Sequence, residues 1–276
     1  MNILAMNANE LKQFFERSPE QVLSDPEAPH AHEALLEALE SGRIRAAERG
    51  EDGVWRANAW VKRAILAGFR RSELTRMEGP GFPMFDKDAY PPRHFSLEDN
   101  VRLVPGGNAV RRGAYVAKGV VVMPPAYINV GSYVDTGTMV DSHALVGSCA
   151  QIGARVHLSA GAQVGGVLEP AGAVPVVVED ETFVGGLVGL FEGVVVRRRA
   201  VLASGVIITG STVIYDLVNS CELRREVPEG AVVVPGSRPA SGGFAAKRGL
   251  CLSAPMIVKY RDERTDAATC LEEALR

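Results

Sequence analysis

Residues 128–152 read INVGSYVDTGTMVDSHALVGSCAQI, and an aliphatic residue stands at every sixth position of this stretch. Neither the 3.6-residue period of a helix nor the two-residue period of a strand explains a repeat of six. A hexapeptide repeat does, and it is typical of a parallel β-helix. The repeated aliphatic residues are Val110, Val116, Val122, Ile128, Val134, Val140, Val146, Ile152, Leu158 and Val164, then Val178, Val184, Leu190, Val196, Leu202, Ile208 and Ile214.

Each six-residue unit predicts one short strand and one turn. The aliphatic side chain points inward, and a small or β-branched residue four positions later, such as Ala114 or Ser132, fits the corner. Glycines between them, such as Gly131 and Gly147, suit turns that need a positive φ. At three units per coil, the 17 units predict nearly six coils, spaced by about 4.8 Å. A β-sandwich with chance spacing is the alternative, but all 17 positions are aliphatic.

The repeat breaks once, because Val164 and Val178 are 14 residues apart where two units would need 12. We therefore expect residues 165–177 to form a loop that bulges from the prism and is free to build a site. The fold class is mainly β, with an α-helical start and a small β/α cap at the end. The predicted boundaries are 1–72 for the helical domain, 73–101 for a linker rich in proline and glycine, 102–220 for the β-helix and 221–276 for the cap.

Local signals place further elements outside the repeat. Helix caps and apolar spacing predict helices, and a glycine-centred turn predicts a hairpin in the N-terminal domain. The expected elements are helices at Glu10–Arg17 (capped by Asn9), His32–Ser41, Asn58–Arg70 and Asp266–Leu275, a hairpin around Gly53, and strands at Gly230–Pro235 and Met256–Tyr260.

Composition excludes several classes of function. The formal net charge of −3 gives no indication of a nucleic-acid partner. No apolar run reaches 18 residues, and the N-terminus lacks the pattern of a signal peptide, so we expect no membrane span and a cytoplasmic protein. The four cysteines are far apart and form no CxxC pair, which fits reduced thiols.

The five histidines do not predict a metal centre. Only His143 and His157 lie in the repeat, and they are 14 residues apart, whereas equivalent positions of successive coils are 18 apart. Catalytic zinc needs about three protein ligands. We therefore expect no metal, although a hexapeptide metal hydratase stays open as an alternative.

Six stretches carry more information than a generic hexapeptide repeat. They are VDTGTMVDSHALVGSCAQIG (Val134–Gly153), VHLSAG (Val156–Gly161), GGVLEP (Gly165–Pro170), WVKRAILAGFR (Trp60–Arg70), FDK (Phe85–Lys87) and VPEGAVVVPG (Val227–Gly236). With these stretches, nearly the whole chain resembles the tetrahydrodipicolinate N-succinyltransferases, enzymes of the succinylase route to diaminopimelate and lysine.

The resemblance implies a left-handed β-helix. The period alone leaves the hand open, and the general preference of crossover connections is right-handed. The resemblance also implies a homotrimer, with acyl-CoA lying as co-substrate along grooves between adjacent prisms and with no permanently bound cofactor. The expected partners are therefore acyl-CoA and a small amino dicarboxylate.

The implied reaction is acyl transfer to an amine, which must lose a proton to attack a thioester. The aspartate of the family's MVD motif contacts the substrate amine, and it corresponds to Asp141. An arginine before the prism, matching Arg102, binds a substrate carboxylate. Ser148, in the VGSCAQIG stretch, is a further expected substrate contact. Without the resemblance, Asp141 would be a solvated turn acid and Arg102 an ordinary surface charge.

One segment departs from the family. Where the family has GARSEVVEG, Gly185–Gly193 reads GGLVGLFEG. Gly189 replaces the family's second essential acid, a glutamate, while Leu187 replaces the arginine and Val188 the serine. We assign these three residues and Gly166 to the acyl-donor pocket. Burying a succinyl carboxylate without a cation or hydrogen-bond donors is costly, so the substitutions favour acetyl-CoA as donor.

Other residues are candidates for the missing acid and for coenzyme A. Substitute bases are His143, His157, Glu169 and Glu192. Expected coenzyme A contacts are Lys247, Arg248 and Lys259 at the phosphates and Ser204 and Gly205 along the pantetheine arm.

The sequence thus predicts an acyl-CoA-dependent N-acyltransferase acting on tetrahydrodipicolinate or its open 2-amino dicarboxylate form, with acetyl-CoA as the favoured donor. The alternatives are the ordinary succinyl-CoA-dependent enzyme of lysine biosynthesis and a catalytically inactive trimeric relative. Retention of both Asp141 and Arg102 argues against the inactive relative. An acetyl donor would suit a secondary, antibiotic pathway of the tabtoxin type.

Overall fold

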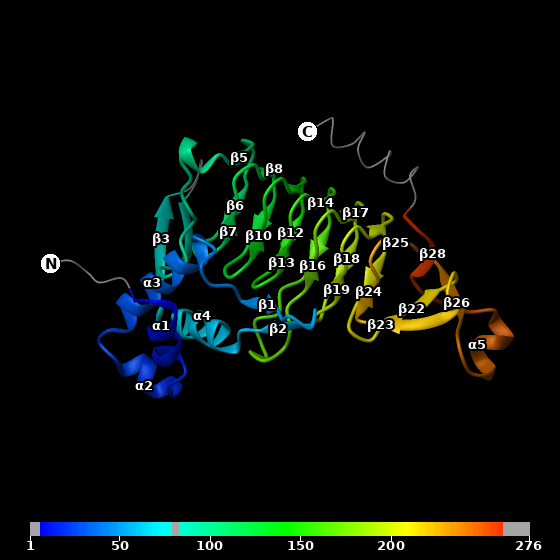
Figure 1. Cartoon of the computed structure of the whole chain (residues 1–276), viewed down its shortest axis with the longest axis horizontal. Coiled ribbons are helices and arrows are strands. Elements are labelled where there is room, and N and C mark those ends of the chain that lie inside the picture. Colours follow the sequence, from blue (N-terminus) through cyan, green and yellow to red (C-terminus); the bar gives the residue numbers. More distant parts are fainter. Residues whose placement is uncertain (1–5, 79–82, 262–276) are drawn as a thin grey trace.

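A prism of short parallel strands runs through the middle of the computed structural model, which describes residues 6–78 and 83–261 (Figure 1). It is the left-handed parallel β-helix that the sequence predicts, and the chain visits its three faces in turn. Face A contains β7 (Tyr115–Val116), β10 (Tyr133–Val134), β13 (Gln151–Ile152), β16 (Val177–Val178), β19 (Val195–Val196) and β24 (Glu226–Val227).

The other two faces have the same construction. Face B contains β5 (Arg102–Leu103), β8 (Val121–Val122), β11 (Met139–Val140), β14 (His157–Leu158), β17 (Phe183–Val184), β20 (Val201–Leu202) and β25 (Ala231–Val234). Face C contains β6 (Ala109–Val110), β9 (Tyr127–Ile128), β12 (Leu145–Val146), β15 (Gln163–Val164), β18 (Gly189–Leu190) and β21 (Ile207–Ile208).

Aliphatic side chains stacked in register form the core of the prism. Val134 pairs with Ile152, and Val140 with Leu158, so each inward side chain lies directly over its equivalent in the next coil. All 17 repeated aliphatic residues are at most 5% exposed. Burial of such a side chain contributes about 1.5–3 kcal/mol to stability, and this contribution offsets the conformational entropy that is lost when strands only two residues long become ordered.

The corners follow a second regularity, because the third residue after most of the repeated aliphatic residues adopts a left-handed backbone. Glycine takes this position at Gly119 (φ +79°) and Gly137 (φ +68°), as expected, but His143 (φ +62°) and Leu187 (φ +59°) also occupy it. The expectation was wrong for Gly147, Gly153 and Gly185, which are not among the positive-φ glycines. These three lie where another strand or turn approaches too closely for a side chain.

The N-terminal helices form a separate core that packs against the prism. Its apolar cluster includes Leu35 and Ile65 and also takes in Val130 and Cys149 of the prism. Gly131 permits this contact, since a Cβ there would lie 2.8 Å from Ile65 Cδ1. The helices are α1 (Ala8–Phe15), α2 (Pro19–Ser24), α3 (Ala28–Glu40) and α4 (Ala59–Arg71).

The first helix begins earlier than predicted. Asn7, and not Asn9, is the cap: its side chain accepts the backbone N–H groups of Asn9 and Glu10, and the Glu10 carboxylate accepts the N–H of Asn7. This reciprocal capping box satisfies backbone groups that the helix itself leaves unpaired. The predicted hairpin around Gly53 is confirmed as β1 (Ala47–Arg49) paired with β2 (Trp55–Ala57).

The stretch expected as a linker contains strands. Residues Leu74–Glu78 (β3) pair antiparallel with Pro83–Lys87 (β4), and a 3₁₀ turn, Leu97–Asp99, follows. The many prolines and glycines of this stretch concealed the hairpin. The predicted loop is confirmed between β15 and β16, where the backbone carbonyl of Ala173 accepts a hydrogen bond from the buried ammonium group of Lys62.

The prism also continues beyond the point where the repeat fails. After the antiparallel pair β22 (Val213–Asp216) and β23 (Cys221–Arg224), β24 pairs with β19 and β25 with β20, so the chain re-enters the coil. The predicted terminal strands are confirmed as β25 and β28 (Met256–Tyr260). The helix expected at Asp266–Leu275 lies outside the described residues.

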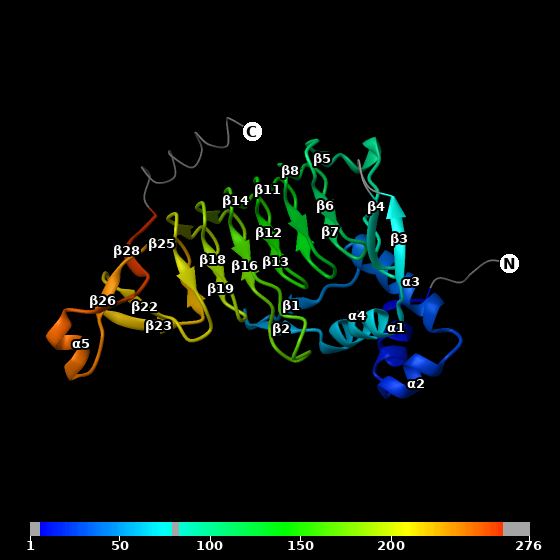
Figure 2. The same cartoon turned by 180° about the vertical axis from the view of Figure 1, so that it is seen from behind.

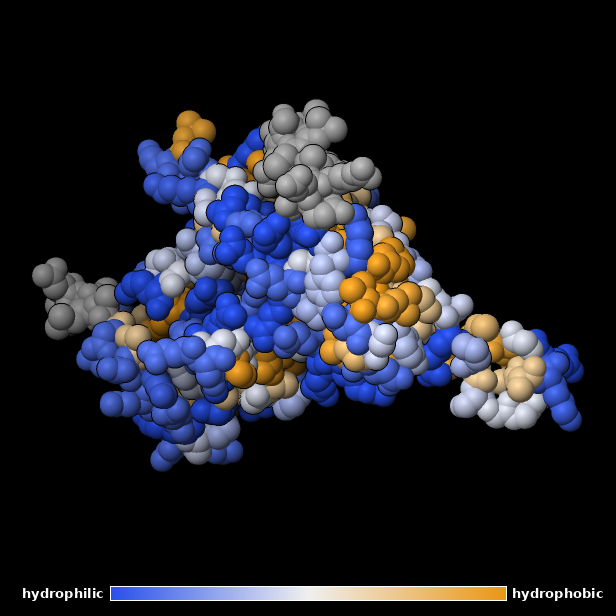
Figure 3. All heavy atoms as spheres, turned by 45° about the vertical axis from the view of Figure 1, so that its right-hand side comes forward, coloured by the Kyte–Doolittle hydropathy of each residue, from blue (hydrophilic) through white to orange (hydrophobic). Residues whose placement is uncertain are grey.

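An arm projects at the far end of the prism, between β25 and β28 (Figures 1 and 2). It consists of β26 (Ser237–Pro239), α5 (Gly243–Arg248) and β27 (Cys251–Ser253), with β26 and β27 paired. Apolar side chains gather in patches on an otherwise hydrophilic face (Figure 3). Across residues 6–78 and 83–261, no helix has the length and apolar character to cross a membrane.

A buried histidine makes the N-terminal core sensitive to acid. His32 is 4% exposed, neither of its ring nitrogens has a hydrogen-bond partner among the described residues, and its ring packs edge-on against Tyr90. Burial, with a contribution from nearby Arg71, lowers the pKa of His32 to about 4. A histidine with a depressed pKa stabilises the fold fully above its unfolded value, about 6.5, and this stability is lost as the pH falls towards 4.

We therefore predict that the free energy of unfolding falls by about 3 kcal/mol between pH 6.5 and pH 4 through His32 alone. Urea unfolding at several pH values measures it. His32→Leu should flatten this part of the profile, whereas the control His94→Leu, at an exposed histidine, should keep the parent slope. An unchanged slope in His32→Leu would contradict the assignment.

Candidate active site

The turns that join face B to face C stack into one corner of the prism, here called corner BC. Asp141 follows β11 on this corner, Leu187 follows β17, and Ser204 with Gly205 follows β20. Successive coils are about 4.8 Å apart, so three coils separate Asp141 from Ser204 by about 14 Å along the axis. Residues scattered over 65 positions of sequence therefore form one line.

Hydrogen bonds fix the position of Asp141 and use only one of its two carboxylate oxygens. Its backbone N–H donates to the carbonyl of Leu158 at 2.9 Å, and one carboxylate oxygen accepts the N–H of Ser142 at 2.7 Å. The second carboxylate oxygen accepts no hydrogen bond from the described residues. The side chain is half-buried, so this free oxygen is available to a ligand that approaches the corner.

Ser148 and Gly166 lie together on the other edge of face C, at the corner that leads to face A (corner CA). The backbone N–H of Val167 donates to the carbonyl of Ser148 at 3.2 Å. A Cβ at Gly166 would lie 2.4 Å from the backbone nitrogen of Ser148, so only glycine permits this approach. Face C, with Gly189 on it, therefore lies between the corner that carries Asp141 and the corner that carries Ser148.

An aromatic ring occupies the space beside Gly189. A Cβ at this position would lie 2.6 Å from Phe191 Cε2 and 2.9 Å from Ile207 Cδ1. Phe191 is partly buried and Ile207 is 48% exposed, so the outer surface of face C is apolar here.

Comparison with known proteins identifies the family. The family model "Tetrahydrodipicolinate N-succinyltransferase N-terminal" matches residues 8–70. Three curated relatives carry the name 2,3,4,5-tetrahydropyridine-2,6-dicarboxylate N-succinyltransferase. The Nitrobacter hamburgensis protein is 41% identical over 257 residues and the Paramagnetospirillum magneticum protein 45%, each covering 91% of this chain and 90% of the relative. The Polynucleobacter asymbioticus protein is 44% identical over 264 residues, 94% and 93% of the two chains.

The chain belongs to the tetrahydrodipicolinate N-succinyltransferase family. It is therefore an acyltransferase, as the sequence predicted. Two differences from the segment GARSEVVEG, at positions 189 and 191, concern the same space. The resemblance implies a glutamate at the position of Gly189 and a valine at that of Phe191, and in this chain the Phe191 ring fills the space next to position 189. Sequence reasoning missed Phe191, although it lies in the divergent segment.

Val188 does not fit its assignment to the acyl-donor pocket. It is fully buried and packs in the core of the prism with the other corner residues. A side chain enclosed on all sides cannot line a surface pocket, so this expectation was wrong. Leu187, by contrast, is 71% exposed on corner BC, and Gly166 is exposed on corner CA.

The remaining expected contacts are spread along the molecule. Arg102 is exposed on β5 of face B, two coils and about 10 Å along the axis before Met139, which precedes Asp141 by two residues. Lys247 and Arg248 lie on α5 in the arm, and Lys259 on β28 (Figure 1). The line of residues on corner BC runs from Asp141 to Ser204 along the prism, and the arm lies at the end of the prism nearer to Ser204.

Of the possible substitute bases, only His143 lies on the same corner as Asp141. His157 is on face B, where its ring packs against Phe183 at a centroid distance of 5.0 Å. Glu192 is on corner CA and accepts the backbone N–H of Gly210 at 3.1 Å, and Glu169 is exposed in the loop. No group of three histidine, cysteine or acidic residues within the described ranges is arranged to hold a metal ion.

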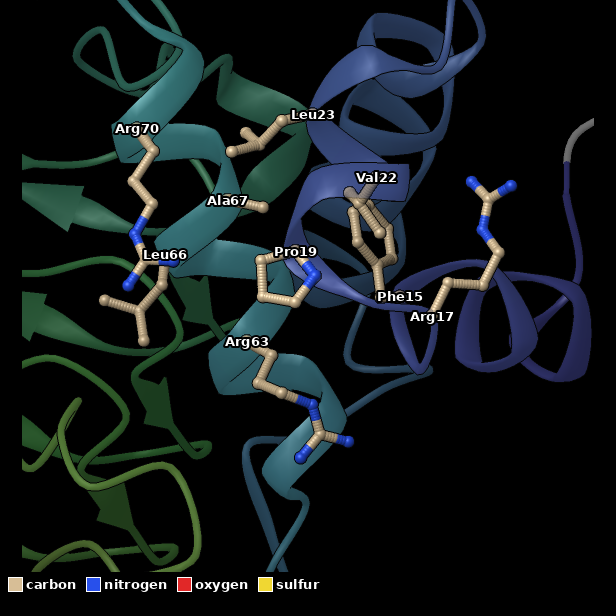
Figure 4. Close-up of a pocket in the computed structure, with 9 residues that line it drawn as sticks. All are labelled: Phe15, Arg17, Pro19, Val22, Leu23, Arg63, Leu66, Ala67 and Arg70. Carbon is tan, nitrogen blue, oxygen red and sulfur yellow. The ribbon is translucent and has the colours of Figure 1, made fainter.

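A cavity elsewhere on the molecule lacks the chemistry for acyl transfer. It measures about 190 Å³ and lies between α4 and the first two helices (Figure 4). Its lining consists of apolar side chains and three arginines, Arg17, Arg63 and Arg70, with no acid, histidine or thiol to accept a proton. The line of residues on corner BC is therefore the better candidate site.

We predict that Asp141→Asn lowers kcat at least about 100-fold, because an amide cannot accept the proton of the substrate amine. The amide oxygen still accepts the N–H of Ser142, so the Tm should hold. Steady-state release of free thiol from acyl-CoA measures the rate. The control His143→Asn keeps a residue that tolerates positive φ and should stay within a few-fold of the parent. The assignment fails if the two variants behave the other way round.

We also predict that Gly189→Glu destabilises the protein, since the new side chain collides with Phe191 and Ile207. Overpacking of this kind costs about 1–3 kcal/mol. Adding Phe191→Val should recover most of the loss, so a double-mutant cycle read by urea unfolding should show strong coupling. Additive effects would mean that the two positions do not share space.

Proposed function

We propose that the protein transfers an acyl group from acyl-CoA to the amine of tetrahydrodipicolinate or of its open 2-amino dicarboxylate form. The observation that carries the proposal is the free carboxylate oxygen of Asp141 on corner BC, beside face C. Tetrahydrodipicolinate is a cyclic imine, so water first adds to its carbon–nitrogen double bond and gives an amine. The nitrogen of this amine then forms a bond to the thioester carbonyl carbon, and the carbon–sulfur bond breaks. Asp141 takes the proton that the amine loses, and coenzyme A leaves as thiolate and becomes a thiol.

The line of residues on corner BC supports a path for coenzyme A. The thioester would lie near Asp141, the pantetheine arm would pass Ser204 and Gly205, and the phosphates would meet Lys247, Arg248 and Lys259 of the C-terminal region. Arg102 and Ser148 are proposed contacts for the carboxylates of the acceptor. Because Arg102 is two coils away from the level of Asp141, we propose that a neighbouring prism completes each site in a homotrimer.

Succinyl-CoA is the donor that we propose. The names of the relatives at 41–45% identity support it. Two of the three substitutions no longer argue for acetyl-CoA. Val188 points into the core, and Phe191 fills the volume that is lost at Gly189. The proposed role is then the one in lysine and diaminopimelate biosynthesis, and no observation on this chain supports an antibiotic pathway.

Acetyl-CoA stays the second candidate because of the apolar surface of face C. Leu187, Phe191 and Ile207 present no charge, and corner BC carries no lysine or arginine from Asp141 to Gly205. A succinyl carboxylate would need its cation from a neighbouring subunit, whereas an acetyl group needs none.

The ratio of kcat/KM for succinyl-CoA and acetyl-CoA, measured with one acceptor, decides between the donors. We predict that succinyl-CoA is preferred at least tenfold, which is about 1.4 kcal/mol in transition-state binding. Tetrahydrodipicolinate and L-2-aminopimelate serve as acceptors, with Asp141→Asn as the background control. A tenfold preference for acetyl-CoA would overturn the proposed donor and keep the acyltransferase, while no turnover with either donor would overturn the function.

A further inference from the structure

A second cavity lies between the hairpin β1–β2 and the prism, away from corner BC. It measures about 290 Å³ and faces the corner that joins face A to face B. Its lining is mostly polar and comes from both the N-terminal domain and the prism. The residues around it include Arg45, Trp55, Asp135, Gln151, Gly153 and Asp180.

Contacts fix the guanidinium group of Arg45 in place but leave some of its hydrogen-bond donors without an acceptor among the described residues. Its carbon Cζ lies 3.6 Å from the centre of the Tyr133 ring, and its Nε donates to the buried Gln151 side chain at 2.9 Å. Burial lowers the pKa of Arg45, yet a guanidinium stays protonated. Its two terminal nitrogens donate no hydrogen bond to the described residues. This is the geometry of an arginine prepared to bind a carboxylate.

Two aspartates of the prism contribute the opposite charge. Asp135 accepts the N–H of Thr136 at 2.7 Å and Asp180 accepts that of Ala154 at 2.9 Å, each with one carboxylate oxygen. Their outer oxygens accept nothing from the described part of the chain. A Cβ at Gly153 would lie 2.3 Å from Asp180 Oδ1, so glycine at this position lets the Asp180 carboxylate approach the turn.

The opposite charges do not neutralise one another directly. Neither aspartate lies within the 4.0 Å of Arg45 that defines an ion pair. Glu179, also at the cavity, is already engaged by Trp55 Nε1 at 2.9 Å, Arg197 Nη1 at 3.0 Å and the Arg198 N–H at 3.1 Å. Glu179 therefore fastens the hairpin to the prism. Arg49 and Arg198 also line the cavity, but Arg49 pairs with Glu179 at 3.7 Å and Arg198 with Glu181 at 2.8 Å. Among the described residues at the cavity, the groups without such a partner are therefore the Arg45 guanidinium and the outer oxygens of the two aspartates.

We propose that this cavity binds a small amino acid as a zwitterion. The carboxylate would pair with Arg45, the ammonium group with Asp135 and Asp180, and the side chain would lie towards the Trp55 indole. The volume is just below the range of about 300–1,000 Å³ for pockets of drug-sized ligands, which suits a smaller molecule. The proposal concerns binding alone and does not depend on the acyl-transfer reaction.

Isothermal titration with L-alanine, L-glutamate and L-lysine tests the proposal, with malonate and propylamine as single-charge probes. At least one amino acid should bind saturably and more tightly than either single-charge probe. Arg45→Lys loses the planar fork and should weaken this binding at least tenfold. The double variant Asp135→Asn and Asp180→Asn keeps the backbone hydrogen bonds and should also weaken it at least tenfold. Arg43→Lys, the same exchange two residues away and outside the cavity, should have no effect.

Three outcomes would overturn the proposal. The first is no saturable binding of any of the three amino acids at millimolar concentration, which would leave the cavity a by-product of hairpin docking. The second is malonate binding as tightly as the amino acids and unaffected by the aspartate variants, which would indicate a plain anion site. The third is amino-acid binding that survives both sets of variants, which would place it elsewhere. The Tm of each variant, compared with the parent, shows whether the hairpin stays docked.

Discussion

The in-register stacking of one aliphatic residue per six is the constraint on which the whole structure depends. A strand of two residues has too few hydrogen bonds to be stable alone, so each coil needs the coils on either side of it. Because Val140 must lie over Leu158, residues 18 apart in sequence, or 26 apart where the loop intervenes as between Leu158 and Val184, are brought to one coil spacing, including those at the corners. The apolar core therefore also determines which polar residues become neighbours.

This constraint explains why the candidate site is a line and not an enclosed cleft. Asp141, Leu187 and Ser204 share corner BC only because the repeat holds its phase across the loop at residues 165–176. The same regularity limits what substitution can do. Position 188 belongs to the inward set, so Val188 faces the core, while position 189 faces outward and the space beside Gly189 is filled by Phe191.

The N-terminal domain uses the prism as a rigid surface, and charge decides how closely the two approach. Glu179 would be costly to bury alone; burial raises the pKa of its carboxyl, but hydrogen bonds from Trp55, Arg197 and the Arg198 backbone outweigh this and hold the pKa below its usual value. Hairpin docking therefore depends on a fully satisfied acid. The neighbouring Arg45, Asp135 and Asp180 line a cavity and keep donors or acceptors without a partner among the described residues. The proposed amino-acid site rests on this difference from Glu179.

The sequence by itself determined the repeat, the break at the loop and the family, because each depends on local spacing or on a contiguous motif. Asp141 likewise became the proposed base from a contiguous motif. Other features depend on pairs far apart in the chain, and only the tertiary structure decided them. The return of β24 and β25 to the prism follows from pairing with β19 and β20 after the repeat has disappeared from the sequence. The cavity at Arg45 joins a residue before the hairpin to aspartates 90 and 135 positions later. Periodicity identifies which residues face inward, but which outward residues meet is set by packing in three dimensions.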